Sequence, residues 1–311
     1  MAFAGLVSMS GQPAAAWHQP VMSAEVLDLL APRPGAVIVD ATVGTGGHSL
    51  SILPRLLPDG RLIAVDRDEI ALGLARQRLV EFEPQASFVH GNYRDLPQLL
   101  RQLGTSRVDG LLLDLGISSL QVDQPERGFS FSKEGPLDMR MDARDEQTAE
   151  ALVNELSADE LALLLSTLGE ERFARRIAQR IVQARRTGPI LTTTQLARLA
   201  AEAVPGRSRH GRIHPATRTF QALRLAVNDE LGALEALLGE LPDLLAPGGR
   251  AVIVTFHSLE DRLVKHAFVR GMQEDIWTVL TKKPARPSRE ETLRNPRARS
   301  AKLRAVQREG S

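Results

Sequence analysis

The chain has 311 residues, of which 43% are hydrophobic and 25% charged, and its 39 basic residues nearly balance its 38 acidic ones. This length and composition suggest a water-soluble globular protein of roughly two domains. The absence of cysteine excludes disulfides, thiolate metal sites and cysteine nucleophiles, and it suits the cytoplasmic location that we expect. No apolar run approaches the roughly 18 residues of a membrane-spanning helix, so we expect no membrane partner. Residues 1–17 lack the positive start of a signal peptide, and a frayed leader is expected there.

Four short runs rich in Val, Ile and Leu follow at nearly constant spacing. They are AVIVDAT (36–42), RLIAVDR (61–67), ASFVHGN (86–92) and VDGLLLDLG (108–116), and they start 25, 25 and 22 residues apart. This interval fits a strand, a crossover helix and the next strand. Because the runs are continuously apolar, we expect a parallel sheet covered by helices on both faces, which is half of a doubly wound α/β fold.

A helical insertion is expected after the fourth strand, because the rhythm stops there. The next strand of this type, RAVIVTF (250–256), follows the turn APGG and one long helical pattern over 217–245. In the gap before them, two residue pairs have the spacing of capping boxes. The pairs are Ser157 with Glu160 and Thr192 with Gln195. These signals predict helices across 122–213.

Two more strands are predicted near the C-terminus, at IWTVLTK (276–282) and AKLRAVQR (301–308), around a basic loop that contains Pro. We therefore expect a sheet domain made of residues 1–121 and 214–311, interrupted by a helical domain over 122–213 that recognises the substrate.

The charged residues are sorted along the chain. Residues 1–170 carry a net charge of −11, whereas 171–225 carry +10 and 261–311 carry +7. A stripe of arginines occupies one helical face of the first basic block: Arg172, Arg176 and Arg180. Either block alone could be a solvated face. Two Arg-rich blocks on an acidic body predict a surface that binds RNA or DNA.

The first predicted strand runs into a glycine-rich turn, VDATVGTGGHS, followed by a helix. Its glycines let the backbone approach a ligand, and the helix N-terminus favours a negative group. Ser49 stands where the nicotinamide-cofactor fingerprint needs its last Gly, so the match to that motif is incomplete. Asp66 ends the second strand 20 residues after Gly46, where a carboxylate can accept hydrogen bonds from ribose hydroxyls. The turn and the carboxylate together predict a nucleoside-binding site.

Asp114 ends the fourth strand, at the edge of the sheet where open α/β folds bind their ligands. Its position alone equally fits a carboxylate that caps the next element. No metal site is expected, because His210 and His214 are followed by Pro215 and have no carboxylate in phase. His257 lacks the nucleophile elbow that a hydrolase pair with its neighbouring Ser would need.

Eight motifs carry a family resemblance: HQPVM (18–22), DATVGTGGHS (40–49), DRD (66–68), DLGISSLQ (114–121), ERGFSF (126–131), PLDMRMD (136–142), RTFQALRLAVNDEL (218–231) and TFHSLEDR (255–262). Together they resemble the bacterial small-subunit rRNA (cytosine-N4)-methyltransferases, and the similarity runs from about residue 17 to the C-terminus. ERGFSF, PLDMRMD and TFHSLEDR are not generic methyltransferase patterns.

The resemblance implies an S-adenosylmethionine-dependent class I methyltransferase, with a Rossmann-like sheet of seven mostly parallel strands and an inserted all-helical domain. The implied substrate is the N4 amine of one cytidine in the decoding region of 16S rRNA, free or within the small ribosomal subunit. The family's cofactor contacts fall on Gly46, Gly47, His48, Asp66, Tyr93, Asp114 and Gln121. Leu120 departs from the Pro that the family usually has before the last of these.

The resemblance also implies roles for three of these side chains. We expect Asp66 to bind the ribose and Tyr93 to lie against the adenine ring. Asp114 is the candidate catalytic residue, because a carboxylate there can orient N4–H and accept its proton. The sequence from Asp114 to Ile117 lacks the Asp/Asn-Pro-Pro-aromatic pattern of DNA amino-methyltransferases, so this catalytic role is a hypothesis.

Two other functions fit part of the sequence. A methyltransferase for a small molecule or a protein would share the cofactor site, but the basic insertion argues against it. An assembly factor that binds S-adenosylmethionine and RNA without catalysis would have the same composition and charge. The sequence makes no prediction of oligomeric state.

Overall fold

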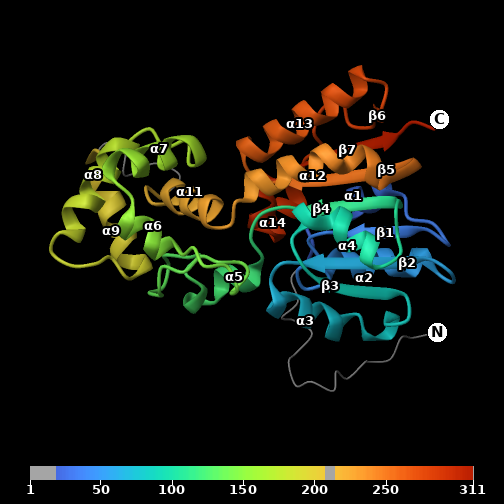
Figure 1. The fold of residues 1–311 in the computed structure, drawn as a ribbon, viewed down its shortest axis with the longest axis horizontal. Coiled ribbons are helices and arrows are strands. Elements are labelled where there is room, and N and C mark those ends of the chain that lie inside the picture. The colour runs from blue at the N-terminus through green and yellow to red at the C-terminus, as the bar shows by residue number, and fades with distance from the viewer. Residues whose placement is uncertain (1–18, 207–213, 311) are drawn as a thin grey trace.

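The computed structural model describes residues 19–206 and 214–310. The expected leader over 1–17, His210 and the end of the expected insertion, 207–213, lie outside the described residues. The described chain forms a sheet flanked by helices, at right in Figure 1, and a separate group of helices, at left. No helix in this part of the chain is long and apolar enough to cross a membrane.

Seven strands form one sheet in the order β3-β2-β1-β4-β5-β7-β6. Their bounds are β1 (Val37–Asp40), β2 (Arg61–Asp66), β3 (Ala86–His90), β4 (Val108–Asp114), β5 (Leu245–Thr255), β6 (Trp277–Val279) and β7 (Lys302–Arg308). Strands β1 to β5 pair in parallel, whereas β7 runs antiparallel to β5 and β6. The predicted Rossmann-like sheet of seven mostly parallel strands is confirmed.

Helices cover both faces of the sheet because its strands are apolar on both sides. Leu111 and Leu113 of β4 point into one core with α4, α12 and α13, and Leu112 points into the other with α1, α2 and α3. These helices are α1 (Ser23–Leu30), α2 (Gly47–Leu56), α3 (Glu69–Arg78), α4 (Leu96–Gln102), α12 (Glu230–Leu244) and α13 (Ser258–Gln273). The doubly wound arrangement expected from the continuous apolar strands is thus present.

Within the described residues, five further helices pack around a core of their own, and we call them the helical cluster. They are α6 (Ala149–Glu155), α7 (Ala158–Leu168), α8 (Ala174–Arg185), α9 (Thr193–Ala203) and α11 (Thr217–Val227). On α8, Ile177 and Ile181 are fully or almost fully buried in this core, and Phe173 packs against it. The apolar side of this helix therefore faces the cluster, and the prediction of an all-helical insertion after the fourth strand is confirmed.

The other helical elements are short. They are α5 (Ser119–Asp123), α14 (Arg289–Arg294) and the 3₁₀ helices η2 (Val80–Phe82), η3 (Tyr93–Asp95), η4 (Pro125–Arg127) and η5 (Pro296–Ser300). The basic loop predicted between the last two strands thus contains α14 and η5.

The prediction of one continuous helix over 217–245 is wrong. Helix α11 ends at Val227 with Asn228 as its C-cap, Asp229 takes a left-handed φ of 42°, and α12 begins at Glu230. The chain has to turn at this point because α11 packs in the helical cluster whereas α12 packs on the sheet. Apolar spacing continues on both sides of the break, but Asn228 and Asp229 have low helix propensity and favour helix ends, so a local signal of the break was present.

Strand β5 begins before the predicted position. Leu245 already pairs with Val108 of β4, and the register then shifts between Val108 and Gly110. Gly248, in the predicted APGG turn, takes a φ of 74°. The turn residues are therefore part of an irregular strand pair rather than a separate turn before the strand.

One predicted capping box is complete and the other is half formed. Ser157 and Glu160 bond reciprocally at the start of α7. At the start of α9, Thr192 Oγ1 accepts from the Gln195 N–H, but Gln195 Oε1 accepts from the Leu191 N–H instead of that of Thr192. The reciprocal half of the second prediction is wrong because the backbone before α9 presents a different donor.

The division into domains stays a prediction, and we propose one change to it. The sequence predicted that the second part of the sheet domain begins at 214, but Ala216, Phe220 and Leu223 are buried in the core of the helical cluster. A boundary at Asn228, where α11 ends, keeps each hydrophobic core within one domain.

Two glycines in helices offer a matched test of this packing. A Cβ at Gly271 of α13 would overlap the ring of the buried Trp277, whereas a Cβ at the exposed Gly239 of α12 would meet nothing within 4 Å. We expect Gly271→Ala to lower the free energy of unfolding by about 1–3 kcal/mol through overpacking. Gly239→Ala should raise it by about 0.5–1 kcal/mol through helix propensity. Denaturant unfolding measures both, and equal effects would contradict the packing of α13 on β6.

Candidate functional site

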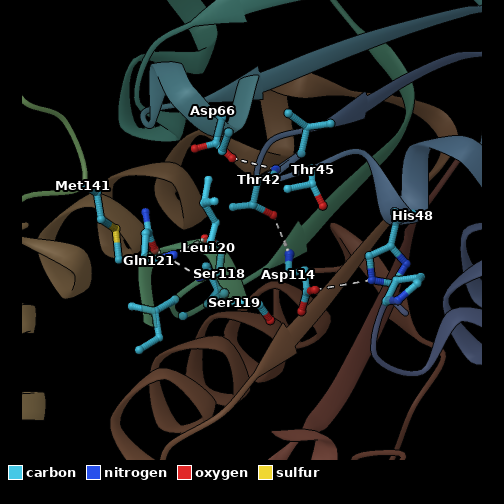
Figure 2. Close-up of a pocket in the computed structure, with 18 of the residues that line it drawn as sticks. Thr42, Thr45, His48, Asp66, Asp114, Ser118, Ser119, Leu120, Gln121 and Met141 are labelled. Atoms are coloured by element: carbon cyan, nitrogen blue, oxygen red, sulfur yellow. Dashed lines mark hydrogen bonds and ion pairs between the residues drawn. The ribbon is translucent and has the colours of Figure 1, made fainter. Parts of the chain in front are cut away.

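A cavity of about 390 Å³ lies at the carboxyl ends of β1, β2 and β4, and Figure 2 shows it in close-up. Its walls include Thr42, Gly44, Thr45, Gly47, His48, Asp66, Tyr93, Asp114, Ser118, Gln121 and Met141. Six of the seven residues predicted as cofactor contacts are among its lining residues, and Gly46 is not. The volume falls within the range of about 300–1,000 Å³ that is usual for small-molecule sites.

The glycine-rich turn shapes the cavity mainly through its backbone. Gly44 and Gly46 have φ values of 53° and 80°, in the left-handed region that favours glycine. Gly46 precedes the first residue of α2, and its N–H donates to the carbonyl of Val43, which closes the turn. A Cβ on Gly47 would press on Pro20 at 3.3 Å. Gly46 therefore forms the turn, and Gly47 lies on the wall.

Asp66 lies at the end of β2 with both carboxylate oxygens held by backbone. Its Oδ2 accepts from the Gly44 N–H at 2.7 Å, and its Oδ1 accepts from the Asp68 N–H at 2.9 Å. Burial raises the pKa of Asp66 to about 6, and these backbone hydrogen bonds oppose that rise. The carboxylate is therefore fixed in orientation, and each oxygen keeps capacity for a further donor from a ligand.

Tyr93 is a buried wall residue whose hydroxyl is anchored. It starts η3 after β3, is 8% exposed, and its hydroxyl donates to the carbonyl of Glu230 at 3.2 Å. Burial, followed by the charge of Glu230, raises the pKa of the phenol far above its usual range. Tyr93 therefore stays neutral and presents an aromatic surface to the cavity.

Asp114 and His48 approach one another on the cavity wall (Figure 2). His48 Nε2 is 3.4 Å from Asp114 Oδ2, and the Asp114 N–H donates to Thr42 Oγ1 at 2.7 Å. Burial by itself lowers the pKa of His48. The hydrogen bond to Asp114 and the negative charges of Asp114 and Asp40 outweigh burial and raise that pKa above its usual value. Among the described residues, Asp114 Oδ1 is buried without a hydrogen-bond partner. That oxygen is an acceptor available to a ligand.

Gln121 lies on the wall, but much of its amide is engaged by the protein. Its Oε1 accepts from the Ser118 N–H in the capping box of α5, and its Nε2 donates to Asp68 Oδ2 at 2.8 Å. Gln121 therefore ties α5 to the start of α3 while it lines the cavity.

Several lining residues were not assigned from the sequence: Arg67, Met141, Glu230, Phe256, Asn295 and Arg297. The first four lie inside motifs quoted above, so motif membership was a signal that could have found them. Asn295 and Arg297 come from the C-terminal loop, where η5 follows α14. Their approach to α5, which includes a contact between Arg297 and Asp123 at 2.9 Å, depends on tertiary packing and has no local sequence signal.

The histidines that could have suggested other chemistry have structural partners. Nδ1 of His214 accepts from the Ala216 N–H, and its ring lies 4.7 Å from that of Phe131. His257 precedes α13 and caps it together with Glu260. Within 19–206 and 214–310, no group of three His, Cys, Asp or Glu side chains is placed to hold a metal ion.

The chain is similar to known proteins along almost its whole length. The sequence profile of the MraW methylase family matches residues 15–309. The ribosomal RNA small subunit methyltransferase H of Nitratidesulfovibrio vulgaris is 50% identical over 322 residues, which cover 98% of this chain and 89% of that protein. The protein of the same name from Cyanothece sp. is 52% identical over 292 residues, or 94% of each chain. A solved SAM-dependent O-methyltransferase from Thermotoga maritima is 11% identical, with a TM-score of 0.43 and coverage of 95% of this chain and 68% of that one.

The contact between His48 and Asp114 predicts a measurable titration. In Asp114→Asn the main causes that raise the pKa of His48 are gone and burial remains, so the midpoint should fall below that of the wild-type chain. NMR of the imidazole across pH measures it. Asp109→Asn, at the opposite end of β4, is the matched control and should leave the midpoint unchanged.

The same contact has a consequence for stability. Because the pKa of His48 is raised in the fold, the contact stabilises the protein below the unfolded value of 6.5. That contribution is lost as the pH rises through the folded pKa. A His48 midpoint that does not respond to Asp114→Asn would contradict the contact.

Proposed function

The chain belongs to the MraW methylase family, and on that premise we propose that it methylates the N4 amine of a cytidine in the decoding region of 16S rRNA. Relatives that are 50% to 52% identical are named small-subunit ribosomal RNA methyltransferases. This chain is an enzyme of that kind, with S-adenosylmethionine as its methyl donor. The alternative of a non-catalytic assembly factor is not favoured, because the match to these enzymes covers nearly the whole chain.

The observation that best supports the proposal is the pair of acidic side chains at one cavity, Asp66 at the end of β2 and Asp114 at the end of β4. The cavity fits the cofactor in its polar groups: Asp66 is a buried acceptor held by two backbone donors, and Asp114 has a buried oxygen without a partner. Tyr93 adds an aromatic wall between them and α12.

We assign the cofactor contacts as the sequence suggested, with one adjustment. Asp66 accepts hydrogen bonds from the ribose hydroxyls, and Tyr93 lies against the adenine ring. Gly47 and His48, at the start of α2, and Gln121, in α5, complete the walls. Gly46 acts through the shape of the turn rather than by contact. When bound, S-adenosylmethionine supplies a methyl group that is already activated by its sulfonium.

The protein's task is then to position and activate the cytidine amine. The N4 lone pair is delocalised into the ring, so N4 is a weak nucleophile. Oδ1 of Asp114, which has no partner among the described residues, would accept N4–H and so localise electron density on the nitrogen. It would take the proton as the N–C bond forms and the methyl–sulfur bond of the cofactor breaks. His48 holds the other carboxylate oxygen in place. The base must leave its stack to enter the cavity.

The RNA is bound by the basic blocks, in the cytoplasm where ribosomal subunits are found. Arg172, in the turn before α8, and Arg176, on α8, are exposed, whereas Arg180 donates to Glu202 Oε2 at 2.6 Å. The prediction of one helical stripe of three arginines is therefore wrong for Arg172, which precedes the helix. Arg172 and Arg176 can still meet phosphates without first breaking an ion pair, whereas Arg180 cannot. Exposed Arg side chains supply the bidentate phosphate contacts that a ribosomal RNA substrate offers.

Substitution of Asp114 tests the catalytic assignment. Asp114→Asn should retain most cofactor affinity but slow single-turnover transfer of labelled methyl at least about 100-fold, because the amide cannot accept the proton. Asp66→Ala is the matched comparison and should instead weaken cofactor binding about tenfold or more. Label is counted in isolated small subunits, free rRNA and protein fractions. Transfer at the wild-type rate would make Asp114 a spectator, and label in protein alone would contradict the proposed substrate.

The exposed arginines at the start of α8 predict a change in salt dependence. Replacing Arg172 and Arg176 together with Gln should flatten the slope of log RNA affinity against log salt by up to about 1.5 units. Arg180→Gln alone should change it little, because Glu202 already neutralises that side chain. Cofactor affinity should be unaltered in both variants. An unchanged slope in the double variant would show that these arginines are only solvated.

A further inference from the structure

Met141 belongs to two parts of the molecule at once. Its side chain is 7% exposed and contributes to the core of the helical cluster, and it also lines the cavity at the edge of the sheet. Figure 2 shows it on the side of the cavity opposite His48. The helical cluster therefore reaches the cavity directly through this side chain.

On one side, the backbone that carries Met141 is held by the buried amide of Asn228. Asn228 Oδ1 accepts from the Met141 N–H at 2.8 Å, and Nδ2 donates to the carbonyls of Met139 at 2.8 Å and Arg224 at 2.9 Å. Asn228 is 2% exposed, so water does not compete for these bonds. The break between α11 and α12 thus provides the side chain that fixes the loop.

The held segment would not keep this shape by itself. Met139 has a φ of 62°, in the left-handed region that residues other than Gly, Asn and Asp seldom adopt. Such a conformation persists only where its surroundings enforce it. The Asn228 side-chain amide bonds to the backbone of Met139 and of Met141, the two neighbours of Arg140, and so is placed to enforce the left-handed conformation of Met139.

The backbone of Asn228 extends the connection to the cofactor side. Its carbonyl accepts from Arg67 Nη1 at 2.8 Å, and Arg67 directly follows Asp66. The next residue but one, Glu230, accepts the Tyr93 hydroxyl through its carbonyl. The short segment from Asn228 to Glu230 therefore bonds to three residues that line the cavity, which are Arg67, Tyr93 and Met141.

We propose that Asn228 is a positioning residue for the methyl transfer: it fixes Met141 as a wall against bound S-adenosylmethionine and thereby ties cofactor binding to the helical cluster. The inference rests on the proposed function, because it takes the ligand of the cavity to be that cofactor. Asn228 itself does not touch the ligand and acts through Met141.

A double-mutant cycle on the full chain tests this dependence, with the dissociation constant for S-adenosylmethionine measured by calorimetry. Met141→Ala and Asn228→Ala should each raise that constant about tenfold. Because Asn228 acts through Met141, the dissociation constant of the double variant should also be only about tenfold above that of the wild type. Independent effects would multiply and raise it about a hundredfold. If Asn228→Ala does not yield folded protein, Asn228→Asp replaces it in the cycle, since it keeps an acceptor for the Met141 N–H but loses the donor to Met139.

Asn154 provides the matched control. It makes the same kind of bonds inside the helical cluster, where its Oδ1 accepts from the Ile190 N–H and its Nδ2 donates to the carbonyls of Ile190 and Glu150. Asn154→Ala should lower the melting temperature, as Asn228→Ala does, but leave cofactor affinity unchanged. Three outcomes would each overturn the positioning role. Asn154→Ala could lose as much cofactor affinity as Asn228→Ala, the effects of Met141→Ala and Asn228→Ala could multiply in the double variant, or Asn228→Ala could leave the dissociation constant unchanged. A wild-type chain that binds no S-adenosylmethionine would instead overturn the proposed function.

Discussion

The buried carboxylate of Asp68 is the interaction on which the edge of the cavity depends. It is 2% exposed, and it caps α3 by accepting from the Ile70 and Ala71 N–H groups. It also accepts from Gln121 Nε2 and Arg127 Nη2, each at 2.8 Å. An unpaired charge at such depth is strongly unfavourable, and removing one partner of a buried ion pair typically costs about 3–5 kcal/mol. The starts of α3, of α5 and of the insertion therefore have to meet at one point.

This meeting point is one of two places where the insertion is fastened beside the cavity. At its start, Arg127 joins Asp68 and also donates to the carbonyls of Arg140 and Met141. At its end, Asn228 bonds to the same loop from the other side. The loop that carries Met141 is thus held from both ends of the insertion, which explains how a separate helical core can keep a fixed position relative to the sheet.

The sequence predicted the elements that depend on local pattern and missed those that depend on distant partners. The spacing of apolar runs predicted the parallel strands, and strand ends placed Asp66 and Asp114 at the same cavity. The break at Asn228 interrupts a segment whose apolar spacing continues on both sides, and the low helix propensity of Asn228 and Asp229 signals it only weakly, so the competition between two cores decides it. Likewise, the Asp68–Arg127 pair joins residues 59 positions apart, and neither motif indicates its partner. The family resemblance named residues at the cavity but not their division into contacts, such as Gly47, and turn formers, such as Gly46.

The acidic groups at the cavity also constrain how a nucleic acid can be bound. The cavity edge gathers buried acidic groups, and burial raises the pKa of both Asp40 and Asp66, the latter to about 6. An acidic edge favours a cofactor with a positive sulfonium and ammonium, and it repels phosphates. In the proposed function the RNA backbone therefore stays on the basic surface of the helical cluster, where Arg172 and Arg176 are exposed. An uncharged base that has left its stack can enter without bringing its phosphate along. Electrostatics, as well as the shape of the cavity, then selects a flipped nucleotide over a stacked one.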